Sequence, residues 1–562
     1  MNESLNKPPL KVAVFLSAME VPAWIYKLLE RINDSTYASV EVIVLNGGGD
    51  TKTCNEPVHG LLHKGRQSMV TRIQQLQEGF SNRYKSYPDY NEKHDLKTLL
   101  NTVSIEVFEP LHGHNEIYFR DDDIKQLEQY DVDVLLNLDE NDLRGDVTEA
   151  FPYGVWHYIF TDKHTNYQAK PGARETLADW PETSSALLYA GKSLNDDKVI
   201  TQSYSCPDNT WIHKTNNLNY WKSLSFMPRA LERCHRLGKA AFYDELCRNT
   251  PHPLFLAKEP PRGFGKLEML SLLMKKAFQK VQLRINDRLF YEQWFLLFNL
   301  NPATSNVLDS YQYILPPKDR FWADPFVIYR DNRYYIFFEE LLFAEDRGFL
   351  SVMTIDQQGR CSEPEVILKE DYHLSYPFVF EHEGEFFMIP ESAQNKTIDL
   401  YRCTGFPNQW VHEMTLMKNV HAVDATLFFK DNKWWMFTNI KENEGASSHE
   451  ELFLFYSESL MSENWVAHPA NPIISDVKKA RPAGKIIEKN GKLYRPSQNC
   501  SRYYGYGLNF NEITVINEHS YQEHTVTSIE PNWDKKVIAT HTFNTDHDIT
   551  IIDGIIRRSH YR

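Results

Sequence analysis

The stretch ADPFVIYRDNRYYIFFE at 323–339 is the first of four similar segments in the second half of the chain. The others are SYPFVFEHEGEFFMIPE at 375–391, VDATLFFKDNKWWMFTN at 423–439 and RPAGKIIEKNGKLYRPSQ at 481–498. Each has an apolar run, a polar pair suited to a two-residue turn, and a second apolar run. The four segments therefore predict four β-hairpins.

The spacing of these hairpins predicts a repeat architecture. The central pairs of the turns are Asp331-Asn332, Glu383-Gly384, Asp431-Asn432 and Asn490-Gly491. They follow one another at intervals of 52, 48 and 59 residues, and a four-stranded propeller blade needs about 40–50 residues. Residues 296–562 have room for five such units, with Ile529 to Asn544 as a poorly matched last one. We expect an all-β five-bladed propeller here.

The first part of the chain has a different pattern. Short apolar runs predict buried strands at Lys11–Leu16, Val40–Leu45 and Asp131–Asn137, and helical spacing occupies Val21–Ile32 and Asp121–Tyr130. Strands that alternate with helices at this spacing are typical of a parallel sheet with covered faces. Residues 1–235 are therefore predicted to form an α/β parallel-sheet domain, and 236–295 a helical linker.

The linker contains one long predicted helix, Lys266 to Phe290, in which apolar residues recur at helical spacing. Basic side chains gather on the same stretch: Lys275, Lys276, Lys280, Arg284 and Arg288. One interpretation is a packing helix between the domains with a solvated basic face. The other is an interfacial helix that makes peripheral contact with anionic lipid. Both stay open at this point.

Composition limits the class of protein. The 562 residues carry a net charge of −15, which argues against a nucleic-acid partner. The seven cysteines are widely spaced and form no pair typical of zinc or disulfides, so we expect reduced thiols. The apolar run Val12 to Met19 is short and is interpreted as a strand, not a secretory signal. These features predict a cytoplasmic protein, with the inner membrane face as an option.

The repeat predicts which polar residues meet. Positions seven before and eight after each turn lie at the same end of a hairpin, and equivalent positions of all blades surround the axis of a propeller. We expect Asp324, Asp424 and Glu391 to converge there as catalytic groups. The predicted substrate-binding residues around them are Glu339, Glu340, Tyr376, Arg481, Arg495, Gln498 and His541.

Several carboxylates beside arginines in one concave site suit sugar chemistry. Making or breaking a glycosidic bond needs one carboxyl that moves a proton and another that acts as base or stabilises positive charge. The alternative is structural, because the same residues can close a ring of blades by hydrogen-bonding backbone ends. For the set as a whole, the functional interpretation is favoured.

The motifs WADPFV at 322–327, YPFV at 376–379 and VDAT at 423–426 resemble the N-terminal-domain family of plant glucosamine inositolphosphorylceramide transferase. That domain is similar to the five-bladed propellers of the arabinanase, levansucrase and invertase superfamily. The resemblance implies Asp324 as base or nucleophile and Asp424 as the group that tunes the pKa or the transition state. It implies Glu391 as the acid.

Residues 11–235 resemble the formyltransferase fold, through DVDVLLN at 131–137, YGVWHY at 153–158 and PGARETL at 171–177. That family places Asn-x-His after the glycine and an Asp later in the chain. Here His157 and Ile159 occupy the first two positions, and Asp196 or Asp197 the third. Isoleucine cannot transfer a proton, so formyl transfer is not expected. The domain is predicted to bind a nucleotide or sugar, or to act as a scaffold.

The leading hypothesis is a cytoplasmic carbohydrate-active enzyme of surface-polysaccharide assembly, a glycosyltransferase that binds a sugar or a nucleotide-sugar donor. Formyl-tetrahydrofolate is not expected as a cofactor, and no metal ligand is assigned. His541 beside the carboxylates leaves a calcium ion open. The alternatives are a sugar N-formyltransferase with an altered site, a non-catalytic glycan-binding protein, and a glycoside hydrolase or phosphorylase.

Overall fold

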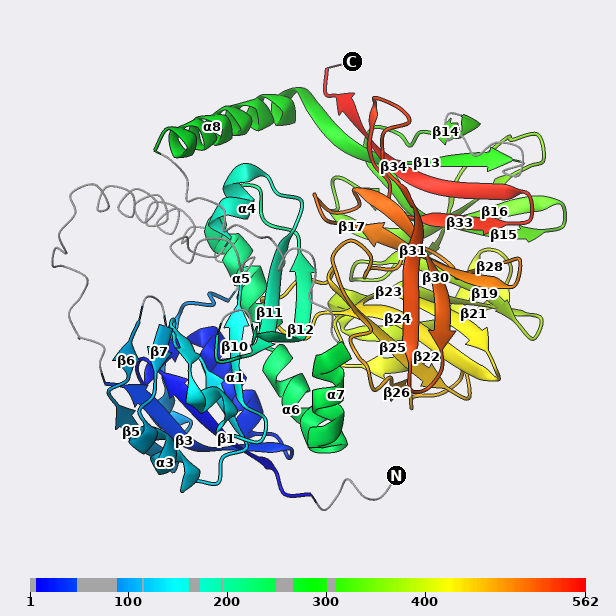
Figure 1. The fold of residues 1–562 in the computed structure, drawn as a ribbon. Coiled ribbons are helices and arrows are strands. Elements are labelled where there is room, and N and C mark those ends of the chain that lie inside the picture. The colour runs from blue at the N-terminus through cyan, green and yellow to red at the C-terminus, as the bar shows by residue number, and fades with distance from the viewer. Residues whose placement is uncertain are drawn as a thin grey trace. The chain divides into compact units, whose positions relative to one another are not determined.

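The computed structural model describes residues 7–47, 88–113, 116–160, 172–193, 196–248, 266–300 and 310–561 (Figure 1). The chain divides into two compact units. The first comprises Met1–Met274 with Asn443–Ala446, and the second comprises Lys275–Glu442 with Ser447–Arg562. Each unit is described by itself below.

The first unit is built on a seven-stranded sheet with the strand order β12-β11-β10-β8-β1-β3-β5. Its strands are β1 (Leu10–Leu16), β3 (Ala38–Asn46), β5 (Ser104–Phe108), β8 (Val134–Asn137), β10 (Val155–Ile159), β11 (Thr183–Tyr189) and β12 (Lys198–Ser205). Neighbours from β5 to β10 pair in parallel, as predicted. The last two strands run antiparallel to their neighbours, so the sheet is mixed and the all-parallel prediction is wrong at this edge.

Two hydrophobic cores cover the two faces of this sheet. Side chains alternate along a strand, so Val12 and Val14 face a core with α1 (Ala23–Asn33), while Ala13 and Phe15 face one with α3 (Asp121–Glu128). The first core also takes side chains from α6 (Phe226–Leu237) and α7 (Lys239–Arg248). The remaining short elements are β2 (Glu20–Pro22), β4 (Lys93–Asp95), β6 (Leu111–His112), β7 (Glu116–Tyr118), β9 (Asp142–Arg144), α4 (Ala173–Ala178) and α5 (Ile212–Ser223).

Helix α8 (Lys266–Leu289) follows and runs directly into β13 (Phe290–Leu300) (Figure 1). The helix predicted for this stretch is therefore confirmed. No helix in the described part of the chain combines the length and apolar character that a membrane span requires. Six of the seven cysteines are described and all six are free thiols, while Cys54 lies outside the described residues.

The described residues of the second unit form five antiparallel sheets. The first contains β15 (Arg320–Arg330), β16 (Arg333–Leu342), β17 (Arg347–Ile355) and β18 (Glu365–Leu368). The second contains β19 (Ser375–His382), β20 (Glu385–Glu391), β21 (Thr397–Gly405) and β22 (Gln409–Lys418). The third contains β23 (Ala422–Lys430), β24 (Lys433–Ile440), β25 (Glu451–Ser457), β26 (Val466–Ala467) and β27 (Ile474–Ser475). The fourth contains β28 (Ile487–Lys489), β29 (Lys492–Asn499), β30 (Gly507–Ile516) and β31 (Tyr521–Ile529).

The fifth sheet joins distant parts of the chain. Strand β13 pairs along its length with β34 (Ile549–Ser559), and β14 (Gln312–Ile314), β32 (Val537–Ala539) and β33 (Phe543–Asp546) complete the sheet. The prediction that Ile529 to Asn544 supply the last unit is therefore confirmed only for β32 and the start of β33, and it is wrong for the main strands. Ile529 ends the outer strand of the fourth sheet, and the main strand pair of the fifth sheet comes from 290–300 and 549–559.

The four predicted hairpins are confirmed. In β15–β16, β19–β20, β23–β24 and β28–β29 the two strands pair around the predicted turn. Both central residues of each turn have positive φ, which identifies the tight turn that matches the twist of paired strands. Seven of the eight central residues are Asn, Asp or Gly, which tolerate this conformation, so the turn chemistry could be recognised from the residues; Glu383 is the exception.

Each sheet packs against the next. One hydrophobic cluster joins the first three sheets through Phe326, Phe378 and Leu427. Another joins the third and fourth through Leu454 and Ile513. The rings of Phe510 and Phe543 meet edge to face between the fourth and fifth sheets, with centroids 4.8 Å apart. A further cluster joins the fifth sheet to the first through residues Ile551 and Val327.

Candidate functional site

Three equivalent residues begin the hairpins with a left-handed backbone. Asp324, Tyr376 and Asp424 have φ of 52°, 43° and 54°, and the strand register shifts at each of them. Such bulges re-aim a side chain next to functional sites, and a left-handed non-glycine residue persists only where its surroundings hold it. Asp324 and Asp424 are 3% and 1% exposed, so both carboxyl groups are directed into the unit.

Asp424 is held by a buried arginine from the loop before β28. The Arg481 guanidinium donates from Nε to Oδ2 of Asp424 at 2.6 Å and from Nη2 to Oδ1 at 3.2 Å. Gln498 donates to Oδ2 at 3.0 Å. Arg481 also reaches Oε2 of Glu391 at 3.4 Å from Nη2, and donates from Nη1 to Nδ1 of His449 at 2.8 Å. One guanidinium therefore fixes two carboxyl groups.

Asp324 lies in a second network tied to the last strand. Its Oδ1 accepts the Thr542 hydroxyl at 2.7 Å, and its Oδ2 accepts the Tyr376 backbone N–H at 3.2 Å. The His541 Nε2 is 3.7 Å from Oδ1. Asp553 on β34 pairs with Nδ1 of His541 at 2.6 Å and accepts the backbone N–H groups of Asp324, His541 and Thr542. Asp553 therefore orients the imidazole that faces Asp324.

Aromatic rings border these charged groups. The His541 ring stacks on Trp294, with centroids 3.9 Å apart, and meets Tyr504 edge on at 5.2 Å. The Arg481 guanidinium lies 4.9 Å from the Tyr504 ring centroid. Tyr504 is 39% exposed and the Glu391 side chain 13%, so these two residues form the solvent edge of the site. We call Asp324, Glu391, Asp424, Arg481, His541 and Asp553 the carboxylate cluster.

Asp324 and Glu391 in the cluster hold protons unusually strongly. Burial, with the neighbouring carboxylates Asp424, Glu339 and Asp553, raises the pKa of Asp324 to about 7 despite the opposing charge of His541. Burial and Asp424 raise the pKa of Glu391 well above its usual range. Burial opposes protonation of His541, but Asp553 and Asp324 outweigh it and raise its pKa to about 8. Perturbed groups of this kind gather at functional sites.

Asp324, His541 and Asp553 each offer a ligand atom, and these atoms lie within 4.8 Å of one another. The oxygens of Asp553 already accept three backbone N–H groups and face Nδ1 of His541. Oxygens that already accept hydrogen bonds in this way favour a hydrogen-bonded network. A hard cation such as calcium requires oxygen ligands that are free to coordinate it. The calcium ion left open by the sequence stays a prediction without support from this geometry.

The structure brings most of the predicted residues together and places others elsewhere. Asp324, Asp424, Glu391, Arg481, Gln498 and His541 meet as described. Glu339 lies 3.3 Å from His373 and close enough to raise the pKa of Asp324. Glu340, the next residue on β16, pairs with Arg320 at 2.8 Å and accepts the Ser351 hydroxyl. Neighbouring residues on a strand face opposite sides of the sheet, so only one of Glu339 and Glu340 can face the carboxylate cluster.

Arg495 and Tyr376 are also committed elsewhere. Arg495 forms a buried two-point ion pair with Glu523, with Nη2 2.7 Å from Oε1. The Tyr376 hydroxyl lies 2.9 Å from the Thr426 hydroxyl and accepts the Gly484 backbone N–H. Its ring is fully buried in the hydrophobic cluster of the first three sheets. These side chains hold the fold together at this end.

The residues that sequence reasoning missed come mainly from loops and from the last strand. Thr542, His449, Tyr504 and Trp294 belong to no repeated motif. Asp553 did leave a signal, because it is the one charged residue in the apolar run ITIIDGII at 549–556. A buried charge in such a run is expected to have a partner.

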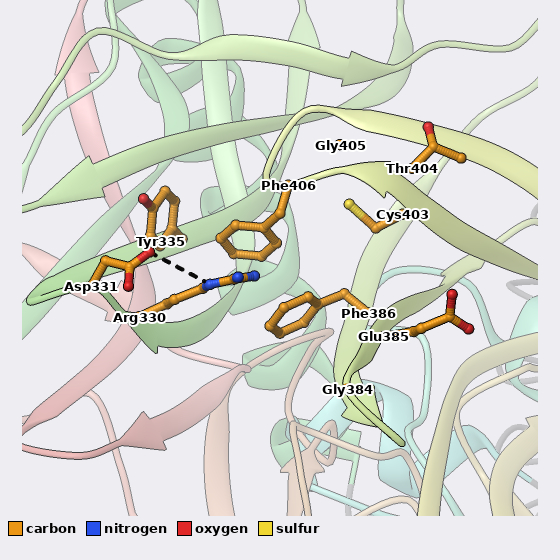
Figure 2. A pocket seen from close by; sticks show the side chains of 10 residues that line it. All are labelled: Arg330, Asp331, Tyr335, Gly384, Glu385, Phe386, Cys403, Thr404, Gly405 and Phe406. Atoms are coloured by element: carbon orange, nitrogen blue, oxygen red, sulfur yellow. Dashed lines mark ion pairs between the residues drawn. The ribbon is translucent and has the colours of Figure 1, made fainter.

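A separate pocket lies at the opposite end of the same hairpins. It has a volume of about 420 Å³ and is lined by residues of the turns, among them Arg330, Gly384 and Gly405. The Arg330 guanidinium lies 5.2 Å from the Phe386 ring centroid and 5.1 Å from that of Phe406 (Figure 2). β15 runs from Arg320 to Arg330, so this pocket and Asp324 lie toward opposite ends of one strand.

The residues predicted as an altered formyltransferase site lie in the first unit. His157 on β10 is 3.2 Å from Asp142 through Nδ1 and 3.6 Å from Asp197 through Nε2. Arg144 pairs with Asp197 at 2.5 Å and with Asp142 at 3.1 Å. We call Asp142, Arg144, His157 and Asp197 the ion cluster. Asp196 pairs instead with Ser193, and Ile159 packs on Ala186 and Leu188.

Comparison with known proteins places the resemblance in the second unit. Residues 311–551 match the family model described as glucosamine inositolphosphorylceramide transferase 1, N-terminal. The proteins named glucosamine inositolphosphorylceramide transferase 1 in Oryza sativa subsp. japonica and Arabidopsis thaliana are 34% and 32% identical over 206 residues. That match covers 36% of this chain and 27% of each relative. The chain thus spans about a quarter of the curated relatives' length.

Solved structures similar to the chain include glycoside hydrolases. One is the catalytic domain of a GH62 alpha-L-arabinofuranosidase from Coprinopsis cinerea, with 11% identity and a TM-score of 0.32, covering 43% of this chain and 94% of that one. Another is a family 117 glycoside hydrolase from Zobellia galactanivorans, with 9% identity and a TM-score of 0.32, covering 47% and 90%.

The comparisons change two expectations. The cytoplasmic location predicted from the sequence is wrong on this evidence, because the matched relatives are named as transferases of inositolphosphorylceramide, a membrane lipid. Scattered cysteines and a short apolar run could not determine the compartment. The formyltransferase resemblance of the first unit receives no support, since the matched region begins at residue 311. It stays a prediction.

Proposed function

We propose that this chain is a carbohydrate-modifying transferase whose second unit is a five-bladed propeller holding the reacting sugar at the carboxylate cluster. The transferase class is supported by the relatives named above. The propeller is supported by five sheets that each pack on the next and by the pairing of the first and last strands of the unit. By the relatives' name, we infer an inositol-containing phospholipid as the acceptor class.

One observation carries the proposal: two carboxyl groups with raised pKa lie beside a carboxylate held by arginine. Pairs of titratable groups in contrasting environments mark acid and base roles. Burial and Asp424 raise the pKa of Glu391 well above its ordinary value, so this carboxyl holds its proton more strongly than an ordinary glutamate does. Glu391 also reaches solvent, and it is suited to donate that proton to a leaving oxygen.

Asp324 is suited to the opposite role. Burial and nearby carboxylates raise its pKa to about 7, so it exchanges a proton readily near neutral pH and can accept one from an attacking hydroxyl. Asp424, fixed by two hydrogen bonds from Arg481, is placed to stabilise positive charge on the sugar ring. The half-exposed Tyr504 ring offers a stacking surface at the entrance.

The proposal is tested with the full chain, a panel of nucleotide sugars, and inositolphosphorylceramide in vesicles. Release of nucleotide and formation of glycolipid are followed together by mass spectrometry. We expect Glu391→Gln and Asp324→Asn to lower the rate by about 10²–10⁴-fold, as expected for loss of an acid or base. Asp399→Asn is the matched control, because Asp399 is equally buried but bonds to Thr397 and Thr415.

Unchanged transfer in both cluster variants would overturn the assignment of the site. Thermal unfolding separates binding from turnover, since a ligand at 100 times its Kd adds about 2.7 kcal/mol. A shift with free sugar but no turnover of any donor would favour the glycan-binding alternative. Release of free sugar from glycosides would favour a hydrolase.

A further inference from the structure

Helix α8 exposes a continuous apolar stripe. Its members recur every three or four residues: Leu270, Met274, Phe278, Val281, Ile285 and Leu289. At 100° per residue they fall within an arc of about 100°. Their exposed fractions range from 40% for Leu289 to 70% for Phe278. Five turns of a helix thus present apolar side chains on one side.

None of the hydrophobic clusters of the described residues includes a member of the stripe. Of the α8 side chains that the structure describes, Leu272 is the one that joins a hydrophobic cluster, beside Ala173, Leu177 and Ile212. Leu272 lies on the other side of the helix from the stripe, about 150° from Phe278 and Val281 on average. The contact that anchors α8 therefore leaves the stripe exposed.

Positive charge follows the same helix. Its 24 residues include six basic and two acidic side chains, although the whole chain carries −15. On the helical wheel Arg284 and Arg288 border one edge of the stripe, and Lys275 borders the other. Long basic side chains can lay their stems along an apolar surface and hold their charge at its rim.

This combination selects among the surfaces that could cover the stripe. A second copy of the helix would bring two strongly basic segments together, and like charges repel. An anionic lipid surface satisfies both features, because the apolar stripe enters the acyl boundary while the basic side chains meet the phosphates. A neutral apolar groove would offer no negative charge to Arg284 and Arg288.

We propose that α8 is an interfacial helix that lies in the plane of a membrane containing anionic lipid, with the stripe from Leu270 to Leu289 buried in it. This inference stands on α8 alone and does not depend on the proposed transferase activity. It assigns a lipid-binding surface to a segment outside the region that matches known relatives.

The test is co-sedimentation of the full chain with phosphatidylcholine vesicles, with and without phosphatidylserine. We expect binding to the anionic vesicles that weakens at high salt. Phe278→Asp should lower the partition coefficient by about tenfold or more, because it places a charge in the acyl boundary. Arg284→Glu with Arg288→Glu should lower binding by about tenfold and only on anionic vesicles.

Leu283→Asp is the matched control. Leu283 is 50% exposed on the same helix but lies off the stripe, so binding should stay close to that of the unaltered chain. Circular dichroism and thermal unfolding confirm that each variant is folded. The proposal is overturned if the chain does not bind anionic vesicles, or if Phe278→Asp and Leu283→Asp bind equally. It is also overturned if sedimentation shows a dimer that Phe278→Asp separates without vesicle binding.

Discussion

The ion cluster of the first unit and the carboxylate cluster of the second use the same residue types in different charge balance. In the ion cluster, Asp142 and Asp197 face Arg144 and His157, so two acids meet two bases. In the carboxylate cluster, four acids, Asp324, Glu391, Asp424 and Asp553, meet Arg481 and His541. Both clusters are buried.

The pKa shifts show the consequence of this difference. In the ion cluster, burial opposes ionisation, but His157 and Arg144 outweigh it and lower the pKa of both aspartates. In the carboxylate cluster, burial prevails and raises the pKa of Asp324 and Glu391. Balanced charges stabilise a fold, while an excess of one sign leaves protons ready for transfer. The comparison therefore points to the second unit as the place of chemistry.

The largest effect is expected from breaking the balanced cluster. Asp197→Asn leaves Arg144 and His157 with Asp142 as their one remaining carboxylate in the cluster, so the buried charges are no longer balanced, and breaking a buried ion pair costs about 3–5 kcal/mol. Hydrogen exchange of the amides of β8 and β10 in the full chain measures this loss. Asp196→Asn in the same loop is the control, because Asp196 is exposed and pairs with Ser193. If Asp197→Asn lowers the free energy of unfolding by less than about 1 kcal/mol, the ion cluster does not stabilise the first unit.

A medium effect is expected from pH. A carboxyl with a higher pKa in the folded state binds more protons there, so the free energy of unfolding falls as pH rises between the two pKa values. For Asp324 this window runs from its ordinary 3.8 to about 7. For His541, raised from 6.5 to about 8, stability is lost over that higher window. Between about pH 4.5 and about pH 6.5, which lie inside the Asp324 window, the second unit should lose about 2–3 kcal/mol, since one pKa unit corresponds to about 1.4 kcal/mol.

The first unit should respond differently over the same range. The aspartates of the ion cluster have lowered pKa, so their contribution is present above their ordinary value and is lost only in acid. The raised pKa of His157 keeps its contribution up to its ordinary 6.5. Hydrogen exchange at about pH 4.5 and about pH 6.5 should therefore show weakening in β15 and β23 but not in β8 and β10. Asp324→Asn should reduce the loss of stability of the second unit between these two pH values. An equal pH dependence of the two units would contradict the contrast between the two clusters.

The smallest effect is expected from Glu391→Gln. Because burial raises the pKa of this carboxyl and so favours its neutral form, the neutral amide of glutamine preserves its shape, a donor and an acceptor. The free energy of unfolding should change by less than about 1 kcal/mol, even where transfer is lost. Chemical denaturation measures it. Glu523→Gln is the contrast in the same unit, since it breaks the buried pair with Arg495 and should cost several times more.

Local features of the fold could be predicted from the residues. The hairpin from Asp324 to Glu339 is encoded in neighbouring positions, because an apolar alternation and the Asp331-Asn332 turn act over a few residues. The helix at Lys266–Leu289 is likewise local. The pairing of β13 with β34 was not predictable, since these strands lie about 250 residues apart and neither belongs to the repeat.

The site shows the same division. The repeat placed Asp324, Asp424, Glu391 and Arg481 at one end of their hairpins, and the structure brings them together. The repeat did not distinguish Glu339 from Glu340, because a shift of one residue along a strand moves the side chain to the other face of the sheet. The repeat also gave no reason to exclude Arg495 from the site. Its partner Glu523 lies on another strand of the same sheet.

The sequence by itself thus determined the hairpins, their turns and the residue types at their ends, because these depend on interactions between near neighbours. The tertiary structure decided which charges face one another. It brought Asp553 from the last strand and His541 from the loop between β32 and β33 to Asp324, and Arg481 from another loop to Asp424. A carboxyl's pKa depends on burial and on charges a few ångströms away, and those distances exist only in the folded chain.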